Sequence, residues 1–204
     1  MDSYIDIQIL HNPEIASALV MNQLFYQLHL TLVENANPVA VSFPDYHVDA
    51  DNHRNNTLGN RLRLHGSATA LNSLNIQQYL VDISNYALLG EIKPVPDVVQ
   101  GYAAFVRKHS KSPRDIDRKR QYLLKKAGGE WNDMAEKSLS RFIEKLRCQL
   151  PFIHLVSHSS KPAEDGGKNY FHLFINKETG EVQQGKLTKY GLSDAQHRTT
   201  VPIF

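Results

Sequence analysis

The stretch YIDIQIL, residues 4–10, and the stretch NPEIASALVMNQLFYQLHLTLVEN, residues 12–35, decide the first part of the fold. Apolar and polar residues alternate along residues 4–10, as they do in a strand with one buried face. Residues 12–35 carry apolar side chains at helical spacing, with Asn12 as the expected cap and Pro13 at the first helical position. We therefore expect a strand followed by a helix.

The next segments extend this order. The short β-branched run PVAVSFP, residues 38–44, and the run NRLRLHGS, residues 60–67, are typical of strands. The stretch SATALNSLNIQQYLVDIS, residues 67–84, is expected to be a helix that opens on a serine or threonine cap. A last strand within residues 86–96 runs into prolines. The resulting βαββαβ order predicts a ferredoxin-like domain over residues 1–96.

This topology occurs in many proteins of unrelated function, so the function has to be inferred from the site residues. The expected third strand, residues 60–64, contains no aromatic residue of the kind that RNA recognition motifs use to stack bases. If the protein binds RNA, the first sheet is therefore not the expected platform.

A second domain is expected over residues 97–204, which makes the fold class α+β. Ser112 and Pro113 open a helix that the glycines at 128 and 129 close near Ala127. A second, amphipathic helix follows, and then two strands of a small antiparallel sheet, at 151–159 and 169–177. The expected buried stripe of the second helix consists of Met134, Leu139, Phe142, Ile143 and Leu146.

The first of these helices lies in a strongly basic segment. Residues 107–126 contain nine Lys or Arg and two Asp, which gives a local net charge of +7 in a chain of net charge +2. Such an asymmetry is typical of a surface that binds a polyanion. Helical spacing places four side chains on one face of this helix: Arg114, Arg118, Gln121 and Lys125.

Arginines in such a row can contact phosphates and guanine edges with two hydrogen bonds each. The alternative is a solvated helix with its own ion pairs, but only Asp115 and Asp117 are available for pairing within it. We therefore favour nucleic acid as the ligand. Because the major groove of duplex RNA is too narrow for most side chains except near an end or a loop, a short hairpin fits best.

Length and composition exclude several classes of protein. With 204 residues, 41% of them hydrophobic, the chain can build a real core. No apolar run approaches the roughly 18 residues of a membrane span, and the first residues do not resemble a secretion signal. The single cysteine, Cys148, cannot form an internal disulfide and is expected to be a core residue near a helix end. These features predict a cytoplasmic protein.

His29 lies within an otherwise apolar helix, where a lone histidine is most often half-buried with one backbone partner. RNA cleavage requires a group that takes the proton of a 2′-hydroxyl, and an imidazole is suited to that step. A metal site built from His154, His158 and His172 is the less favoured alternative. On a strand, residues 154 and 158 lie about 13 Å apart, too far for two ligands of one ion.

Several short motifs occur together and in a fixed order. They are MDSYIDIQI at the start, QLHLTLV around His29, VSFPD at 41–45, LGNRLRLHGS at 58–67, LPFIHLVSHSS at 150–160, YFHLFI at 170–175, YGLS at 190–193 and the final VPIF. With the proline-led basic helix, they extend from one end of the chain to the other. In this combination the chain resembles the CRISPR repeat-processing endoribonuclease of type I-F systems.

This resemblance implies a ferredoxin-like domain and a second domain that presents an arginine-rich helix to an RNA hairpin. It implies an enzyme that cuts the CRISPR precursor transcript at the 3′ base of each repeat stem-loop, without a metal ion or other cofactor. The product stays bound, and other subunits of a type I-F surveillance complex are the implied protein partners.

The resemblance also implies roles for individual residues. His29 matches the catalytic histidine, Ser157 the serine that positions the attacking 2′-hydroxyl, and Tyr190 the tyrosine that orients the histidine. Phe171 matches the aromatic residue on which the last base pair stacks, and Ser159 is expected near the phosphate. The remaining RNA contacts are expected from the linker and the basic helix, at Arg107, Lys108, His109, Lys111, Arg114, Arg118, Lys119, Gln121 and Lys125.

The basic helix departs from the family pattern. It carries Asp115, Asp117 and several lysines where arginines are expected, so the repeat sequence that it reads is expected to differ. The linker pair that reads bases is Arg107 with either Lys108 or His109. Two alternative functions remain open: a hairpin-binding subunit that no longer cuts, and a DNA-binding protein, which is disfavoured because no helix-turn-helix pattern precedes the basic helix.

Overall fold

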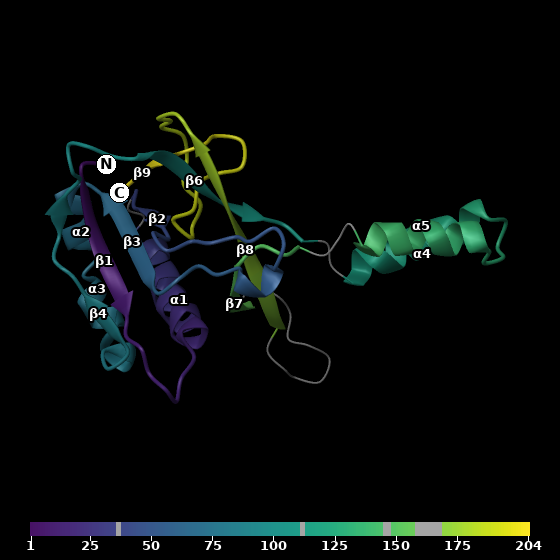
Figure 1. Cartoon of the computed structure of the whole chain (residues 1–204), viewed down its shortest axis with the longest axis horizontal. Helices are drawn as coiled ribbons and strands as arrows, with labels where there is room; N and C mark the ends of the chain where they lie inside the picture. Colours follow the sequence, from purple (N-terminus) through teal and green to yellow (C-terminus); the bar gives the residue numbers. More distant parts are fainter. Residues whose placement is uncertain (36–37, 111–112, 145–147, 158–168) are drawn as a thin grey trace. The chain divides into compact units, whose positions relative to one another are not determined.

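The computed structural model describes residues 1–35, 38–110, 113–144, 148–157 and 169–204 (Figure 1). The chain forms two compact units. One consists of Met1–Arg107 together with Leu150–Phe204, and the other consists of Lys108–Gln149. This division differs from the expected boundary between residues 96 and 97, because the C-terminal segment packs with the N-terminal elements in the larger unit.

The first sheet of the larger unit is antiparallel, with the order β2-β3-β1-β4. A further short strand, β5, also pairs with β1. Alternate side chains of β1 are buried, which confirms the strand predicted from YIDIQIL. The strands of this sheet are β1 (Ser3–Ile9), β2 (Ala40–Ser42), β3 (Arg61–Gly66), β4 (Ala87–Leu89) and β5 (Lys93–Pro94).

The long helix α1 (Ser17–Asn35) begins later than expected. The Asn12 side chain accepts hydrogen bonds from the backbone N–H groups of Glu14 and Ile15, as a cap does, at 2.8 and 3.2 Å. The turn that it stabilises does not continue into the helix, which starts at Ser17. The predicted start at Pro13 was therefore four residues too early.

The helix predicted over residues 67–84 is divided into shorter pieces. Ser67 caps the first of them, since its hydroxyl oxygen accepts from the backbone N–H of Ala70 at 3.1 Å. Asn75 then adopts a left-handed conformation, with φ of 45°, which interrupts the helix. The pieces are α2 (Ala68–Ser73), α3 (Ile76–Tyr79) and the 3₁₀ turn η2 (Val81–Ile83); another 3₁₀ turn, η1 (His53–Asn55), precedes β3.

The second sheet of the larger unit has the order β7-β8-β6-β9. Its strands are β6 (Gly101–Lys108), β7 (Phe152–Ser157), β8 (Asn169–Gly180) and β9 (Val201–Ile203). The predicted strand pair is confirmed in β7 and β8, which are antiparallel. Strand β6 was not predicted from the sequence, because its centre is four consecutive buried residues instead of an alternation.

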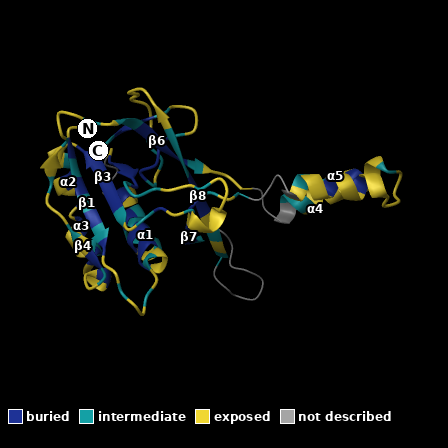
Figure 2. Cartoon of the chain, viewed as in Figure 1, coloured by how far each residue is buried: buried dark blue, intermediate teal, exposed yellow. Residues whose placement is uncertain are grey.

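One hydrophobic core joins the two sheets of this unit (Figure 2). Phe105 of β6 and Leu173 of β8 belong to the same cluster of buried residues as Ile7 of β1 and Phe25 of α1. This shared core is why the second sheet belongs to the same unit as the first, and it brings α1 close to the C-terminal segment.

The smaller unit is a helical hairpin of α4 (Pro113–Lys126) and α5 (Asp133–Glu144). The predicted basic helix is confirmed, and Gly128, with φ of 77°, supplies the left-handed residue that follows it. Leu123 of α4 packs against Ala135 and Leu139 of α5. Met134 was predicted to lie on the buried stripe but is 79% exposed, because the stripe runs through Ala135 instead.

The other predicted stripe residues of α5 have different environments. Ile143 is exposed and Phe142 is half-buried, whereas Leu146 lies outside the described residues. Cys148, which was predicted to lie in the core, is half-buried. Within the described residues, none of the helices is long and apolar enough to span a membrane.

Candidate functional site

The His29 side chain is oriented by a backbone carbonyl from the far end of the chain. Its Nδ1 atom lies 2.9 Å from the carbonyl oxygen of Lys189. Because a carbonyl can only accept a hydrogen bond, Nδ1 carries the proton and donates it. Nε2 of the neutral ring is then left with its lone pair, which makes it the atom that can take up a proton.

An aromatic ring fixes the plane of the same imidazole. The rings of His29 and Tyr190 are nearly parallel, at 25°, with 4.3 Å between their centroids. Tyr190 in turn stacks at 6.3 Å on Phe25, which is fully buried in the core. The half-buried His29 is therefore positioned by a contact in its plane and by another on its face.

The loop that carries Lys189 and Tyr190 is held at several points. The backbone N–H of Gly191 donates to the carbonyl of Thr188, and the Gly191 carbonyl accepts from the Val41 N–H. Two residues on, the N–H of Ser193 donates to the carbonyl of Phe105 in β6. Gly191 has φ of 70°, and its Cα lies so close to β2 that an added Cβ would be 2.6 Å from a Val41 methyl group.

A cation lies beside these rings. The Arg107 guanidinium carbon is 5.5 Å from the centroid of the Phe171 ring and 5.9 Å from that of Tyr190. Phe171 is half-buried on β8 and packs against the main core. Arg107, Phe171, Tyr190 and His29 are thus linked in one cluster, in which Arg107 contacts the Tyr190 ring that stacks on the imidazole.

Ser157 is the last residue of β7 and is half-buried. In the β7–β8 pair it lies opposite Asn169, and Leu155 lies opposite Phe171. Because side chains alternate along a strand, Ser157 and Phe171 lie on the same face of the pair. A hydrogen bond of 2.9 Å from the His154 N–H to the Asn22 side chain links β7 to α1, the helix of His29.

The predicted RNA contacts of the smaller unit occupy different parts of it. Arg118, Gln121 and Lys125 are exposed on α4. Arg118 is 79% exposed at its side chain, and it makes a long contact of 3.6 Å with Asp115. Helical spacing puts these three residues opposite Ile116 and Leu123, which face α5. An exposed row of basic and amide groups therefore runs along the outer face of α4.

Lys119 lies off this row. Its ammonium group is 5.1 Å from the ring centroid of Tyr122 and 5.7 Å from that of Phe142. Lys108, the last residue of β6, and His109, which follows it, are both exposed. Arg114 is part of α4, but its side chain is outside the described part of the chain, as are Lys111 and Ser159.

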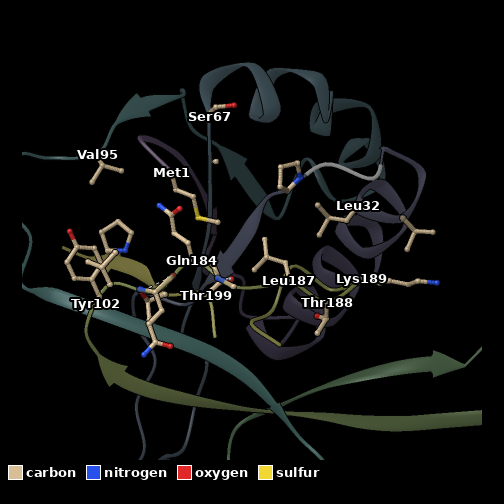
Figure 3. A pocket seen from close by; sticks show the side chains of 18 residues that line it. Met1, Leu32, Ser67, Val95, Tyr102, Gln184, Leu187, Thr188, Lys189 and Thr199 are labelled. Carbon is tan, nitrogen blue, oxygen red and sulfur yellow. Dashed lines mark hydrogen bonds between the residues drawn. The ribbon is translucent and has the colours of Figure 1, made fainter. Parts of the chain in front are cut away.

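The loop before Tyr190 also lines a cavity of about 860 Å³ (Figure 3). Leu187, Thr188 and Lys189 contribute to its wall, together with Met1 and Leu32. Lys189 is the one charged side chain among the lining residues, and the others are apolar or neutral amides and hydroxyls. A wall of this kind is poorly suited to a polyanion, so the half-buried cluster of Arg107, Phe171, Tyr190 and His29 is the better candidate site.

Comparisons with known proteins point to one protein family. The model of the family Cas_Csy4, CRISPR-associated protein, matches residues 4–204. The CRISPR-associated endonuclease Cas6/Csy4 of Escherichia coli (strain UTI89 / UPEC) is 32% identical over the full length of both chains. Its counterpart of the same name in Pseudomonas aeruginosa (strain UCBPP-PA14) is 32% identical over 95% of this chain and 96% of its own.

A solved structure of Thermus thermophilus Cse3, bound to an RNA representing a pre-cleavage complex, also aligns with the chain. The alignment covers 99% of both chains, with 11% sequence identity and a TM-score of 0.30. That score is too low to establish a common fold.

Proposed function

The chain belongs to the Cas_Csy4 family of CRISPR-associated proteins and is an endoribonuclease that processes pre-crRNA, and we propose that it cuts by internal attack of a ribose 2′-hydroxyl. The observation that carries this mechanism is the hydrogen bond from His29 Nδ1 to the Lys189 carbonyl. It leaves Nε2 as a proton acceptor, which is what a general base requires.

In the proposed reaction, Ser157 holds the 2′-hydroxyl in line with the scissile phosphate and His29 Nε2 removes its proton. The 2′-oxygen forms a bond to phosphorus while the bond from phosphorus to the 5′-oxygen breaks. The products are a 2′,3′-cyclic phosphate and a 5′-oxygen that takes up a proton to become a hydroxyl. Because the nucleophile belongs to the substrate, positioning by the protein supplies much of the rate.

We propose that the substrate is the stem-loop of the CRISPR repeat, cut at its 3′ base and retained afterwards in a type I-F complex with other subunits. The exposed row on α4, Arg118 with Gln121 and Lys125, would contact the hairpin. Phe171 would stack on the last base pair of the stem. The sheet order β2-β3-β1-β4, with a helix after β1 and another after β3, supports a ferredoxin-like N-terminal part.

The decisive test uses the purified protein in EDTA and a labelled stem-loop from the repeat of its own host. A matched substrate carries 2′-deoxyribose at the nucleotide before the cut. We expect cleavage of the first RNA and binding without cleavage of the second. Tight binding without cleavage of either RNA would point to a non-cutting hairpin cap, and cleavage of the deoxy substrate would exclude the proposed chemistry.

A second prediction concerns Arg118 on the outer face of α4. Replacing Arg118 with alanine is expected to weaken hairpin binding and to reduce the slope of log K against log salt by about one, as loss of one phosphate contact does. The ion pair of the exposed Arg118 side chain with Asp115 is long and weak, so the helix itself should be unaffected. Affinity is measured by filter binding at several salt concentrations.

Lys137 offers a matched control, because it is an exposed basic residue on the other helix of the same hairpin. The Lys137→Ala variant should keep the salt slope of the unchanged protein. Equal effects of the two substitutions would indicate a general contribution of net charge instead of a docking face on α4.

A further inference from the structure

Five rings form a continuous row along one face of the β7–β8 pair, which we call the aromatic row. The rings of His154 and His172 are 5.0 Å apart at their centroids, and Phe152 lies 4.4 Å from His172. Tyr170 extends the row beyond His154, and Phe174 extends it beyond Phe152, at 5.0 and 5.3 Å. None of these residues has a part in the proposed cutting reaction.

The strand register places these rings on the face that points away from the core. His154 lies opposite His172, and Phe152 opposite Phe174. The residues between them on β7 and β8, such as Ile153 and Leu173, are fully buried in the main core. The pair therefore has one face for packing and a second face covered with aromatic and imidazole rings.

Four of the five rings on this second face are exposed to solvent, whereas Phe174 is buried. Phe152 is 47% exposed and Tyr170 is 59% exposed, and His154 and His172 are exposed as well. Neighbouring rings in the row are inclined to one another by 41° to 68°, so part of a ring face stays open. Aromatic residues grouped in this way at a surface mark a binding site more often than scattered ones do.

The charge and protonation of the row suit a nucleic acid. No carboxylate occurs in β7 or in β8 from Asn169 to Ile175. Partial desolvation and the neighbouring His154 lower the pKa of His172, which favours the neutral ring. A neutral imidazole beside phenyl and phenol rings can take part in stacking, and no negative group in these strand segments would repel a phosphate chain.

We infer that the aromatic row binds unpaired nucleotides that flank the base of the RNA stem. This inference rests on the proposed function. The row lies on the opposite face of the β7–β8 pair from Ser157 and Phe171, and its Tyr170 end is next to them along the strands. Tyr170 is adjacent in sequence to Phe171, where the last base pair is expected to stack, and Val156, opposite Tyr170, is adjacent to Ser157. An unpaired strand that leaves this end of the β7–β8 pair reaches the row at Tyr170 first.

The test compares a bare stem-loop with stem-loops that carry five unpaired nucleotides on the 5′ side or on the 3′ side. All three RNAs are made uncleavable by 2′-deoxy substitution at the cut. We expect one flank to raise the affinity about tenfold, the size of effect that stacking of about one base provides. The flank that raises the affinity identifies the side of the stem that reaches the row.

A double substitution, Phe152→Val with Tyr170→Val, removes two exposed rings and keeps side chains that favour strands. It should abolish the gain from the flank and leave binding of the bare stem-loop within about twofold, since no proposed hairpin contact is changed. Fluorescence of 2-aminopurine in the flank should be quenched by the unchanged protein and not by the double variant. The control Leu88→Ala replaces an exposed apolar residue of β4 in the same unit and should keep both effects.

Two results would overturn the inference. One is that neither flank raises the affinity, and the other is that the gain and the quenching survive in the double variant. Failure of the proposed function would look different, because the bare stem-loop itself would then be neither bound nor cut.

Discussion

Replacement of His29 by alanine is expected to lower the rate of cutting by about 10²–10⁴-fold, the usual contribution of a general base. The His29 ring has one backbone partner, the Lys189 carbonyl, and one stacking partner, Tyr190. Neither contact involves the exposed row on α4, so hairpin affinity should stay within a few-fold. Single-turnover cleavage and filter binding on the same preparation measure the two quantities separately.

The matched control for this variant is His53→Ala, which removes an exposed histidine in the 3₁₀ turn η1. It should cut at the rate of the unchanged protein. A loss of hairpin affinity in His29→Ala as large as its loss of rate would show that His29 serves binding or packing. Added imidazole should restore part of the rate, because the vacated side-chain space opens next to the Lys189 carbonyl.

The strands that the sequence predicted well are those with one buried face. Along β1 the alternation of apolar and polar residues follows directly from packing on one side, so local pattern and tertiary structure agree. In β6 the residues from Ala103 to Val106 are all buried, and the periodicity of such a continuous apolar run does not distinguish a strand from a buried helix. Arg63 of β3 is only 4% exposed and forms a bidentate ion pair with Asp6. No local sequence pattern indicates that this arginine is buried.

The candidate site shows the same limit. Expected roles for His29, Tyr190 and Phe171 came from the sequence motifs in which these residues occur. The hydrogen bond from His29 to the Lys189 carbonyl determines which ring nitrogen of His29 carries the proton. It joins residues 160 positions apart and uses a backbone oxygen, which has no sequence signature. The YGLS motif did contain a usable signal, because a glycine directly after the tyrosine is typical of a tight turn.

The second large prediction concerns Gly191, because this residue controls the position of the Lys189 carbonyl. Alanine at this position would have to adopt φ near 70°, which costs about 1 kcal/mol for a residue with a Cβ. Its Cβ would also lie 2.6 Å from the Val41 side chain and 3.0 Å from the Val39 carbonyl. We expect Gly191→Ala to lower the free energy of unfolding by about 2–4 kcal/mol in total.

The catalytic effect of Gly191→Ala should exceed what the loss of stability explains. The loop can relieve the clash only by moving away from β2, and Lys189 and Tyr190 move with it. Since a displacement of about 1 Å in a catalytic group can cost about 100-fold, cutting by the folded fraction should fall by a similar factor. Urea denaturation gives the folded fraction, and single-turnover cleavage well below the midpoint gives its rate.

The Gly128→Ala variant separates the cost of the left-handed backbone conformation from the effect of the clash with β2. Gly128 has a similar φ of 77°, but an added Cβ would meet no atom within 4 Å. In that variant the free energy of unfolding should fall by about 1 kcal/mol, from the backbone conformation alone. Its cutting rate, corrected for the folded fraction, should stay unchanged. If Gly191→Ala lost no more rate than Gly128→Ala, the loop would tolerate displacement, and the Lys189 carbonyl would not be what positions His29.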